Sequence, residues 1–490
     1  MRNMSGLDGA FLHIETPDTP MHVAALYLLA RPEACNGDFF STVKRLLMPR
    51  LSLSPFFRAR LAPMPLQFAN PVWVDSAALD IDYHLRHIAL PKPGNRTQLE
   101  DRVAELHATL LDRHYPLWEM YVIEGLESGD IALYLKIHHA ALDGAAGIAL
   151  STALFDLTAE ALEAPADSHK QVGSSEQPGL AQRVDAAFRH TAAQYVKLGR
   201  HLPEVMRVLA GMIKTTEDNT ATKPQRGAVF APKTPLNVPI TGERGFAAIS
   251  LPLDEIRHIA RYHEVKINDV VLAICSGALR LYLHNHGGVP RRSLIATMPV
   301  SLREAGNTDT TTQATLTRVK LATHIADPLR RLRAISAATD VVKAQTNRAK
   351  SIIPTDFPSI GVPWVLSTLA SLYGRSTLAK IIPPLANLAI SNIPGPQQPL
   401  YVAGARIRAY WPLSIVEHGL GLNITVLSYC ESLDIGLTVA RNAVPEVRLL
   451  AQALTLAHEE LKQLSATPAA SNKSGRKGAA SVRSKPGRSA

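Results

Sequence analysis

Cysteine is scarce in this chain, which has only three among 490 residues. Cys35, Cys275 and Cys430 lie far apart and form no C-x-x-C pair, so their spacing supports neither a disulfide framework nor a structural zinc site. A reducing cytoplasm fits this usage. Aromatic residues make up 6% and charged residues 19%, whereas hydrophobic residues reach 46%. This balance is typical of a globular protein with a large aliphatic interior, and it excludes a chain that is disordered throughout.

Several signatures of common enzyme and membrane classes are also absent. The sequence has no G-x-S-x-G elbow, no complete G-x-x-x-x-G-K-[ST] or G-x-G-x-x-G loop and no H-E-x-x-H helix, so it supports neither a serine hydrolase nor a nucleotide-phosphate cradle. Residues 1–20 hold three acids and no continuous apolar stretch, unlike a secretory signal. Pro358 and Pro363 interrupt the nearest candidate for a membrane span, Phe357–Gly374, which we interpret as a buried or interfacial segment.

Positive charge is concentrated at the carboxyl-terminal end. The chain carries +10, from 52 Lys and Arg against 42 Asp and Glu. Residues 466–490 hold six of the basic residues and no acid, which leaves +4 for the other 465 residues. So small a charge on the body does not indicate a nucleic-acid groove. The tail, rich in Ser, Gly and Ala, is predicted to be disordered, either as a solubilising end or as an electrostatic contact with anionic lipid.

A chain of 490 residues is too long for one hydrophobic core, so two or more domains are expected. Two polar, breaker-rich stretches, Pro165–Gly179 and Thr215–Pro239, flank a basic amphipathic segment at Leu180–Ile213. That segment is interpreted either as a solvated helical face or as an interfacial membrane contact. The expected parts are an amino-terminal lobe, a linker with amphipathic helices, a carboxyl-terminal lobe and a disordered basic tail, at residues 1–164, 165–239, 240–465 and 466–490.

Hydrophobic periodicity predicts strands and helices in both lobes, which indicates a mixed α/β class with an active site between two lobes. The expected strands are Met21–Leu29, Pro71–Asp75, Ile81–His87, Trp118–Glu124, Ile131–Ile137, Phe246–Leu251, Leu294–Val300, Gly421–Ser428 and Leu433–Val439. The expected helices are Gly37–Arg60, Gln98–His114, Gly147–Leu162, Leu253–Tyr262, Asn268–His284 and Glu446–Leu464.

The densest cluster of chemically active residues is IHHAALDG at residues 137–144, where an expected strand runs into a small-residue loop. Adjacent residues on a strand point to opposite faces, so His138 and His139 cannot jointly face one ligand if the strand continues through them. One imidazole is expected to face a cavity as a general base, because it titrates near neutral pH and can take a proton from a hydroxyl. Asp143 is expected to fix the loop or an arginine. The alternative is a pair of structural histidines at a strand end.

This cluster resembles the H-H-x-x-x-D-G motif of the coenzyme A-dependent acyltransferase superfamily. Further motifs follow the same pattern in order: MSGLDGAFLHIETPDTPMHV at 4–23, PLW at 116–118, ND at 268–269, PVSLR at 299–303 and SNIPGP at 391–396. Together they resemble the bacterial wax ester synthase/diacylglycerol acyltransferase family from about residue 4 to residue 464. The resemblance implies a two-lobe α/β (α+β) fold like that of chloramphenicol acetyltransferase, with the active site in a tunnel between the lobes.

The resemblance also implies a role for each residue of the histidine motif. His139 would be the general base and proton acceptor, and His138 would support it. Asp143 would be structural and hold the loop through an arginine, for which Arg303 in PVSLR is the candidate. Gly144 would permit close approach of the backbone to substrate, or it is an ordinary glycine at a helix entry.

Three more site residues come from the second half of the chain. Asn268 would donate a hydrogen bond to the developing oxyanion, and the alternative is that it caps its helix. Ser391 and Asn392, in SNIPGP, resemble a loop beside the tunnel and would contact substrate together with Gly144 and Arg303, or they form a plain turn.

The activity that the resemblance implies is transfer of a long-chain fatty acyl group from acyl-CoA to diacylglycerol, to a long-chain fatty alcohol, or to both. The thioester is already activated, so neither a metal nor a cofactor is expected, and acyl-CoA is a substrate. The implied location is cytoplasmic, at the inner face of the plasma membrane or on lipid inclusions, with no nucleic-acid partner. The alternatives are a condensation-type acyltransferase with a carrier-bound donor and a non-catalytic lipid-surface protein. Acceptor preference, chain length and oligomeric state stay open.

Overall fold

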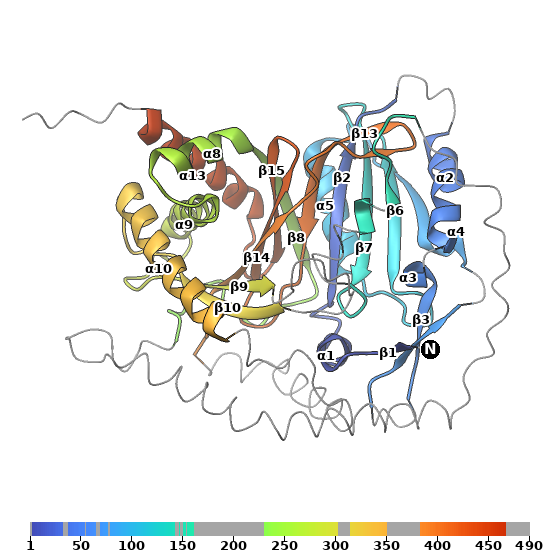
Figure 1. Cartoon of the computed structure of the whole chain (residues 1–490), viewed down its shortest axis with the longest axis horizontal. Coiled ribbons are helices and arrows are strands. Elements are labelled where there is room, and N and C mark those ends of the chain that lie inside the picture. The colour runs from blue at the N-terminus through green and yellow to red at the C-terminus, as the bar shows by residue number, and fades with distance from the viewer. Residues whose placement is uncertain are drawn as a thin grey trace, which may run out of the picture.

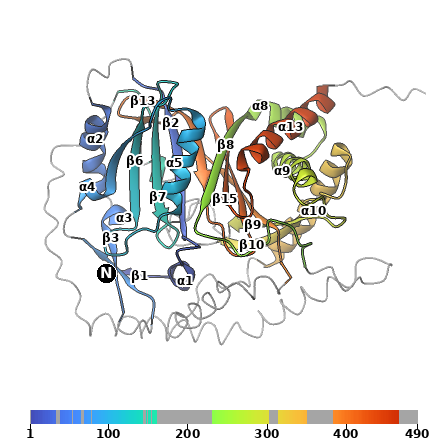
Figure 2. The same ribbon diagram turned by 180° about the vertical axis from the view of Figure 1, so that it is seen from behind.

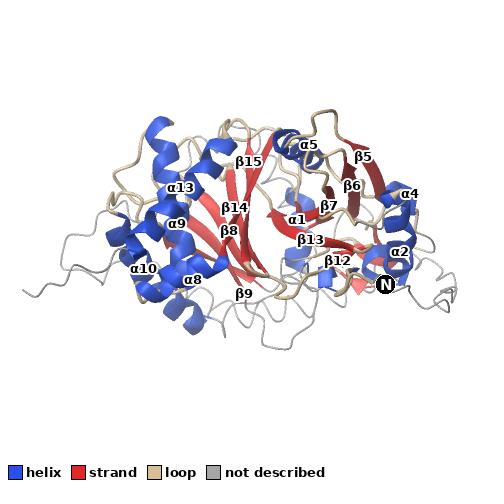
Figure 3. Ribbon diagram, turned by 90° about the horizontal axis from the view of Figure 1, so that it is seen from above, coloured by secondary structure: helices blue, strands red, loops and turns tan. Residues whose placement is uncertain are grey.

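The computed structural model describes residues 2–32, 38–53, 55–64, 69–76, 79–142, 147, 150–152, 154–160, 230–301, 314–349 and 383–466. Within these residues two six-stranded sheets stand next to one another, each with helices packed against it (Figure 1). Seen from above, the sheets lie between an outer group of helices at either end (Figure 3). The described chain therefore has two lobes that meet sheet to sheet.

The first lobe is built mostly from the amino-terminal part of the chain. Its large sheet contains β2 (His22–Leu29), β5 (Leu85–Ala89), β6 (Trp118–Glu124), β7 (Ile131–His138), β12 (Tyr401–Val402) and β13 (Ala405–Leu413), in the order β12-β13-β2-β7-β6-β5. A small sheet of order β1-β4-β3 contains β1 (Arg2–Asn3), β3 (Ala59–Ala62) and β4 (Val72–Asp75). The helices are α1 (Gly6–Ile14), α2 (Phe39–Leu53), α3 (Pro55–Arg58), α4 (Ile81–His84) and α5 (Arg96–Ala108).

The second lobe places its helices on the outer side of its sheet (Figure 1). The strands are β8 (Arg244–Pro252), β9 (Ile295–Ser301), β10 (Ala314–Lys320), β11 (Leu388–Pro394), β14 (Leu422–Tyr429) and β15 (Ser432–Ala440), in the order β10-β9-β11-β14-β15-β8. The helices are α8 (Leu253–Tyr262), α9 (Ile267–Asn285), α10 (Pro328–Ala349) and α13 (Val447–Ala466). Helix α9 is apolar over most of its surface and lies in the centre of this helical layer, where burial of its side chains stabilises the lobe.

Strand β7 carries the histidine motif at its end, and its residues alternate between two cores. The odd-numbered residues from Ile131 to Ile137 pack with residues of α2 and α3, whereas Ala132 and Tyr134 pack with residues of α5. This is the period-2 pattern of a strand that is buried on both faces. By the same parity His138 belongs to the side of α5.

Strand β13 joins the two lobes. It lies late in the sequence but pairs with β2, so an orange strand stands beside blue and cyan ones in Figure 1. It also crosses β15, where the backbone N–H of Tyr410 donates to Asp434 Oδ2 at 2.7 Å. Gly436 lies at this crossing, and a Cβ at that position would stand 1.8 Å from the carbonyl oxygen of Pro412. The sheets therefore approach so closely here that only glycine fits.

A buried carboxylate makes a second junction between the lobes. Helix α5 lies against β8 at the back of the molecule (Figure 2). Glu100 on α5 is 4% exposed, and its Oε1 accepts from Arg96 Nε at 3.0 Å and from the backbone N–H of Ala248 at 3.2 Å. Its Oε2 accepts from Nε of Arg448, on α13, at 3.0 Å. Three elements of both lobes are thus bonded to one side chain.

Most of the expected strands and helices are present, and the differences lie in the first lobe. The helix expected over Gly37–Arg60 is divided into α2 and α3, and its last two residues belong to β3. Ile81–His87 is not extended throughout, because the Asp80 carboxylate accepts from the backbone N–H of Tyr83 at 3.2 Å and caps the short helix α4. The helix expected over Gln98–His114 ends at residue 108. There the Lys136 ammonium donates to the carbonyls of Leu106 and Thr109. It thus satisfies backbone acceptors that a further helical turn would otherwise occupy.

The helix expected over Gly147–Leu162 is wrong over residues 155–160. Residues 155–160 are not helical, since Asp156 and Tyr401 exchange two backbone hydrogen bonds at 2.9 and 2.8 Å. Among the residues that the structure describes, no helix is long and apolar enough to cross a membrane. Three further expectations fall outside the described residues: the helical segment Leu180–Ile213, the segment Phe357–Gly374 and the tail 466–490, except its first residue, which ends helix α13. The boundaries expected between the parts of the chain stay a prediction.

Candidate active site

The two histidines are held by backbone hydrogen bonds where β7 ends. His138 is paired with His22 of β2, and its N–H donates to the carbonyl of Leu117 at 3.0 Å. The N–H of His139 donates to the carbonyl of Met21 at 2.9 Å. The residues that precede β6 and β2 thus hold both histidines, and a turn begins directly after His138.

The two imidazoles have different surroundings. His138 is completely buried; its Nδ1 accepts from the backbone N–H of Ala140 at 3.0 Å, and its Nε2 lies 3.2 Å from Glu15 Oε1. Because Nδ1 is the acceptor, this arrangement fits the tautomer that carries its proton on Nε2, facing the carboxylate. His139 is half-buried, and its ring stacks on Phe11 with centroids 4.2 Å apart and planes at 20°. The ring of His138 is committed to the protein interior.

Glu15 is the principal site residue that the sequence did not single out. Its Oε1 also accepts from the backbone N–H of Met21 at 3.0 Å, and its Oε2 accepts from Arg113 at 2.8 Å. Burial opposes ionisation of this carboxyl, but the bonds from His138, Met21 and Arg113 outweigh it and lower its pKa to about 2. The residue lies inside the MSGLDGAFLHIETPDTPMHV motif, yet nothing in a single sequence distinguishes it from the other acids there.

A polar network lies on the α5 side of the same strands. Nδ1 of His107 shares a hydrogen bond of 2.9 Å with the Tyr134 hydroxyl, and Nε2 of His22 lies 2.5 Å from the His107 carbonyl oxygen. Burial lowers the pKa of His107 to about 3 and that of His22 well below its usual value. Both are therefore neutral at physiological pH. The fully buried Lys136 ammonium pairs with Glu119 at 3.0 Å.

The second lobe brings two predicted residues together. Asn392, in the second half of β11, donates through Nδ2 to Oδ1 of Asn268 at 3.2 Å. Asn268 does not cap α9, because the helix begins at residue 267 and its N-cap is Lys266. The next residue, Asp269, is fully buried and accepts from the Ser336 and Thr339 hydroxyls at 2.9 and 2.6 Å, which ties α9 to α10.

Some predicted residues cannot be placed. Asp143, Gly144 and Arg303 lie outside the described residues, so their roles stay predictions. Ser391 is half-buried in β11, where it pairs with Thr425 of β14. SNIPGP therefore begins as a strand, so for Ser391 and Asn392 both the expected loop and the plain turn are wrong, and their contact with substrate stays a prediction.

Sequence profiles identify the group to which this site belongs. The wax ester synthase/diacylglycerol acyltransferase catalytic domain matches residues 4–271, which include both histidines and Asn268. The chain belongs to this family. The WS/DGAT C-terminal domain matches residues 312–462, which include Asn392. The family and the enzyme class expected from the motifs are confirmed: this WS/DGAT-family chain is an O-acyltransferase.

Two relatives align with nearly the whole of this WS/DGAT-family chain. The O-acyltransferase WSD of Acinetobacter baylyi is 34% identical over 94% of this chain and 96% of its own length. A putative diacylglycerol O-acyltransferase of Mycobacterium tuberculosis is also 34% identical, over 94% of this chain and 99% of its own.

Solved structures confirm the two-lobe α/β fold. The wax ester synthase/diacylglycerol acyltransferase of Marinobacter aquaeolei VT8 is 29% identical, with a TM-score of 0.68 over 95% of this chain and 100% of that one. The first condensation domain of the calcium-dependent antibiotic synthetase has a TM-score of 0.52 at 16% identity, over 96% of this chain and 97% of its own. That second likeness concerns the fold alone.

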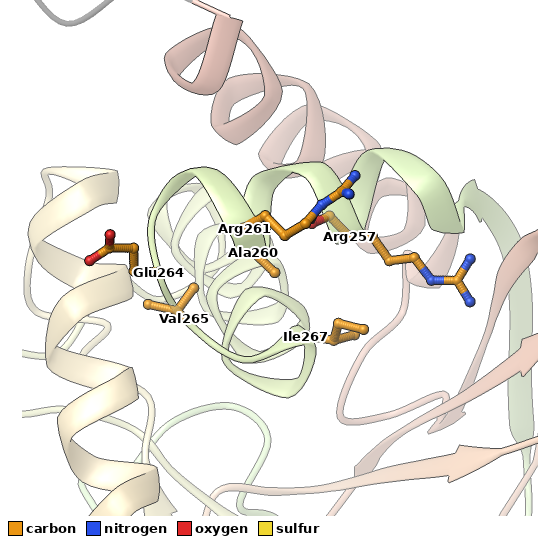
Figure 4. Close-up of a pocket in the computed structure, with 6 residues that line it drawn as sticks. All are labelled: Arg257, Ala260, Arg261, Glu264, Val265 and Ile267. Atoms are coloured by element: carbon orange, nitrogen blue, oxygen red, sulfur yellow. The ribbon is translucent and has the colours of Figure 1, made fainter.

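A cavity of about 440 Å³ lies at the corner between α8 and α9 of this acyltransferase (Figure 4). Its lining residues are Arg257, Ala260, Arg261, Glu264, Val265 and Ile267. It adjoins Asn268 in sequence, but none of the predicted site residues is among those that line it.

Proposed function

We propose that this enzyme transfers a long-chain fatty acyl group from acyl-CoA to the hydroxyl of diacylglycerol, of a long-chain alcohol, or of both. His139 is the general base. The observation that carries this assignment is the contrast between the two rings: both nitrogens of His138 face the Ala140 N–H and Glu15, whereas His139 lies half-buried on the ring of Phe11 at the strand end.

The proposed reaction needs only one proton acceptor. His139 takes the hydroxyl proton of the acceptor as its oxygen attacks the thioester carbonyl carbon. The tetrahedral intermediate then collapses, the C–S bond breaks, and the coenzyme A sulfur leaves and takes the proton back from His139. The products are an ester and free coenzyme A. The thioester is activated before it binds, so no metal is required for this chemistry.

Asn268 is the proposed donor to the oxyanion of that intermediate. Asn392 donates to its Oδ1, which fixes the amide so that Nδ2 of Asn268 points away from Asn392 as a hydrogen-bond donor. A preorganised donor of this kind contributes roughly 3 kcal/mol to transition-state stabilisation. Asp143 is proposed to hold the loop through Arg303, with Gly144 and Ser391 beside the substrate.

The test is acceptor-dependent release of free coenzyme A from palmitoyl-CoA, run with hexadecanol, with dioleoylglycerol and without acceptor. We expect His139→Ala to reduce release by about 100- to 10,000-fold in a folded protein. His114→Ala is the matched control, because its side chain is 93% exposed. Full activity of folded His139→Ala would refute the assignment, and turnover only with a carrier-bound acyl donor would replace acyl-CoA by that donor.

Peripheral association with the inner face of the plasma membrane or with lipid inclusions is part of the proposal, because both acceptors are lipids. The six basic residues of the tail support attraction to an anionic surface. Sedimentation with phosphatidylglycerol vesicles, before and after deletion of residues 467–490, measures this contribution. Unchanged sedimentation would exclude the tail as the membrane contact.

A further inference from the structure

Helices α8 and α13 face one another across a cluster of three potential metal ligands that the acyl transfer does not use. Glu255 lies on α8, and His458 and Glu459 lie on α13. Each offers one ligand atom, and these three atoms all lie within 4.8 Å of one another. The carboxylates are 26% and 46% exposed, whereas the imidazole is 2% exposed, so solvent reaches the cluster from the side of the carboxylates.

Two buried atoms in this cluster face each other without a hydrogen bond. Nε2 of His458 and Oε2 of Glu255 are 3.3 Å apart, and neither has a hydrogen-bond partner. The two atoms lie within ion-pairing distance, yet the geometry gives no hydrogen bond between them, and a buried polar atom without one is costly. A metal ion bound to both atoms, in place of the imidazole proton, would satisfy them.

The separation of these atoms is that of two ligands on one tetrahedral metal ion. With bonds of 2.0–2.1 Å, adjacent ligands of a tetrahedral ion are about 3.3 Å apart. One nitrogen and two carboxylate oxygens form a donor set suited to zinc and neighbouring divalent metals, rather than to calcium or magnesium. Water from the exposed side completes the fourth position.

We propose that Glu255, His458 and Glu459 bind a divalent transition-metal ion of the zinc type, which joins α8 to α13 and has no part in the acyl transfer. Lys462 is the competitor for this position. Its ammonium lies 2.8 Å from Glu255 Oε1 and 3.6 Å from Glu459 Oε1, so it neutralises the same carboxylates when the metal is absent. Since α9 packs on α13, the bound ion stabilises the helical layer that carries Asn268.

The experiment is equilibrium dialysis of the full chain, stripped with chelator, against Zn²⁺, together with melting temperatures and the visible absorption of Co²⁺. We expect saturable binding, a raised Tm, and at least tenfold weaker binding in Glu255→Gln. Glu460→Gln is the matched control, because this neighbouring acid pairs with Arg331 instead and belongs to no cluster. Lys462→Met is expected to bind more tightly, since it removes the competing cation.

His458→Gln removes the nitrogen ligand and should also weaken Zn²⁺ binding. Because this side chain is buried, the comparison of Glu255→Gln with Glu460→Gln tests the proposal if His458→Gln does not fold. The proposal is overturned if Zn²⁺ leaves the Tm of the wild type unchanged, or if Glu255→Gln binds as tightly as Glu460→Gln. Loss of the Co²⁺ absorption in Glu255→Gln but not in Glu460→Gln would support direct coordination.

Discussion

Oε1 of Glu15 lies 3.2 Å from Nε2 of His138, and the same oxygen accepts the N–H of Met21 at 3.0 Å. The carbonyl of Met21 in turn accepts the N–H of His139. A single carboxylate oxygen is thus linked to the ring of one histidine and, through one residue, to the backbone of the other. Glu15 positions both histidines without lying in their motif.

Replacement of Glu15 by Gln should make stability depend less on pH in the acid range. The pKa of Glu15 falls from 4.5 to about 2 on folding, so its ionised form stabilises the fold above pH 4.5, and this contribution disappears as pH falls toward 2. We expect wild type to exceed the variant by on the order of 3 kcal/mol near pH 6, and by progressively less below pH 4.5. Urea unfolding at several pH values measures the difference; a gap that stays constant with pH would contradict this account.

Replacement of Asn268 by Ala should lower kcat by about 100- to 1000-fold while KM changes little, because an oxyanion donor acts on the transition state. Asn392→Ala removes only the partner of Asn268 Oδ1 and should cost roughly tenfold. Asn285→Ala, at the exposed far end of the same helix, is the control. Steady-state kinetics separates the outcomes, and equal losses in Asn268→Ala and Asn285→Ala would remove the assigned role.

Replacement of Glu100 by Ala should destabilise the junction of the lobes by about 2–3 kcal/mol, because it leaves the buried Ala248 N–H without its acceptor and removes one acceptor each from Arg96 and Arg448, whose half-exposed guanidinium groups keep another. Glu105→Ala breaks only an exposed pair on the same helix and should cost less than about 1 kcal/mol. Denaturant unfolding followed by tryptophan fluorescence measures both. Similar losses in the two variants would show that the junction does not depend on Glu100.

Replacement of Gly436 by Ala should prevent close packing of the two sheets, since the new Cβ would stand 1.8 Å from the Pro412 carbonyl oxygen while strand pairing on both sides holds β15 in place. We expect a loss of about 3 kcal/mol or more, near the upper end of overpacking effects. Gly129→Ala is the comparison, because nothing lies within 4 Å and only its φ of +77° opposes a side chain, at roughly 1 kcal/mol. Melting temperatures rank the two, and a stable Gly436→Ala protein would require the sheets to separate.

Local patterns predicted much of the fold. Two apolar segments on either side of the turn ESGD predicted β6 and β7, and a long apolar run predicted α9, because these signals lie within a short stretch of sequence. The errors arose where a distant residue decides the local structure. Lys136 ends α5, and Tyr401 draws Asp156 out of a helical pattern, and neither effect is visible within a short window of sequence.

The same division holds for the site. Ordered motifs by themselves determined the family and the enzyme class, and they named His138, His139, Asn268 and Asn392, since motif spacing is a one-dimensional property. Only the tertiary structure decided that Glu15 holds the histidine pair and that Asn392 orients Asn268. Asn268 on α9 and Asn392 in β11 are 124 positions apart, and Glu15 at the end of α1 is equally remote from His138 at the end of β7. Hydrogen bonds depend on distance in space, which strand pairing and helix packing establish.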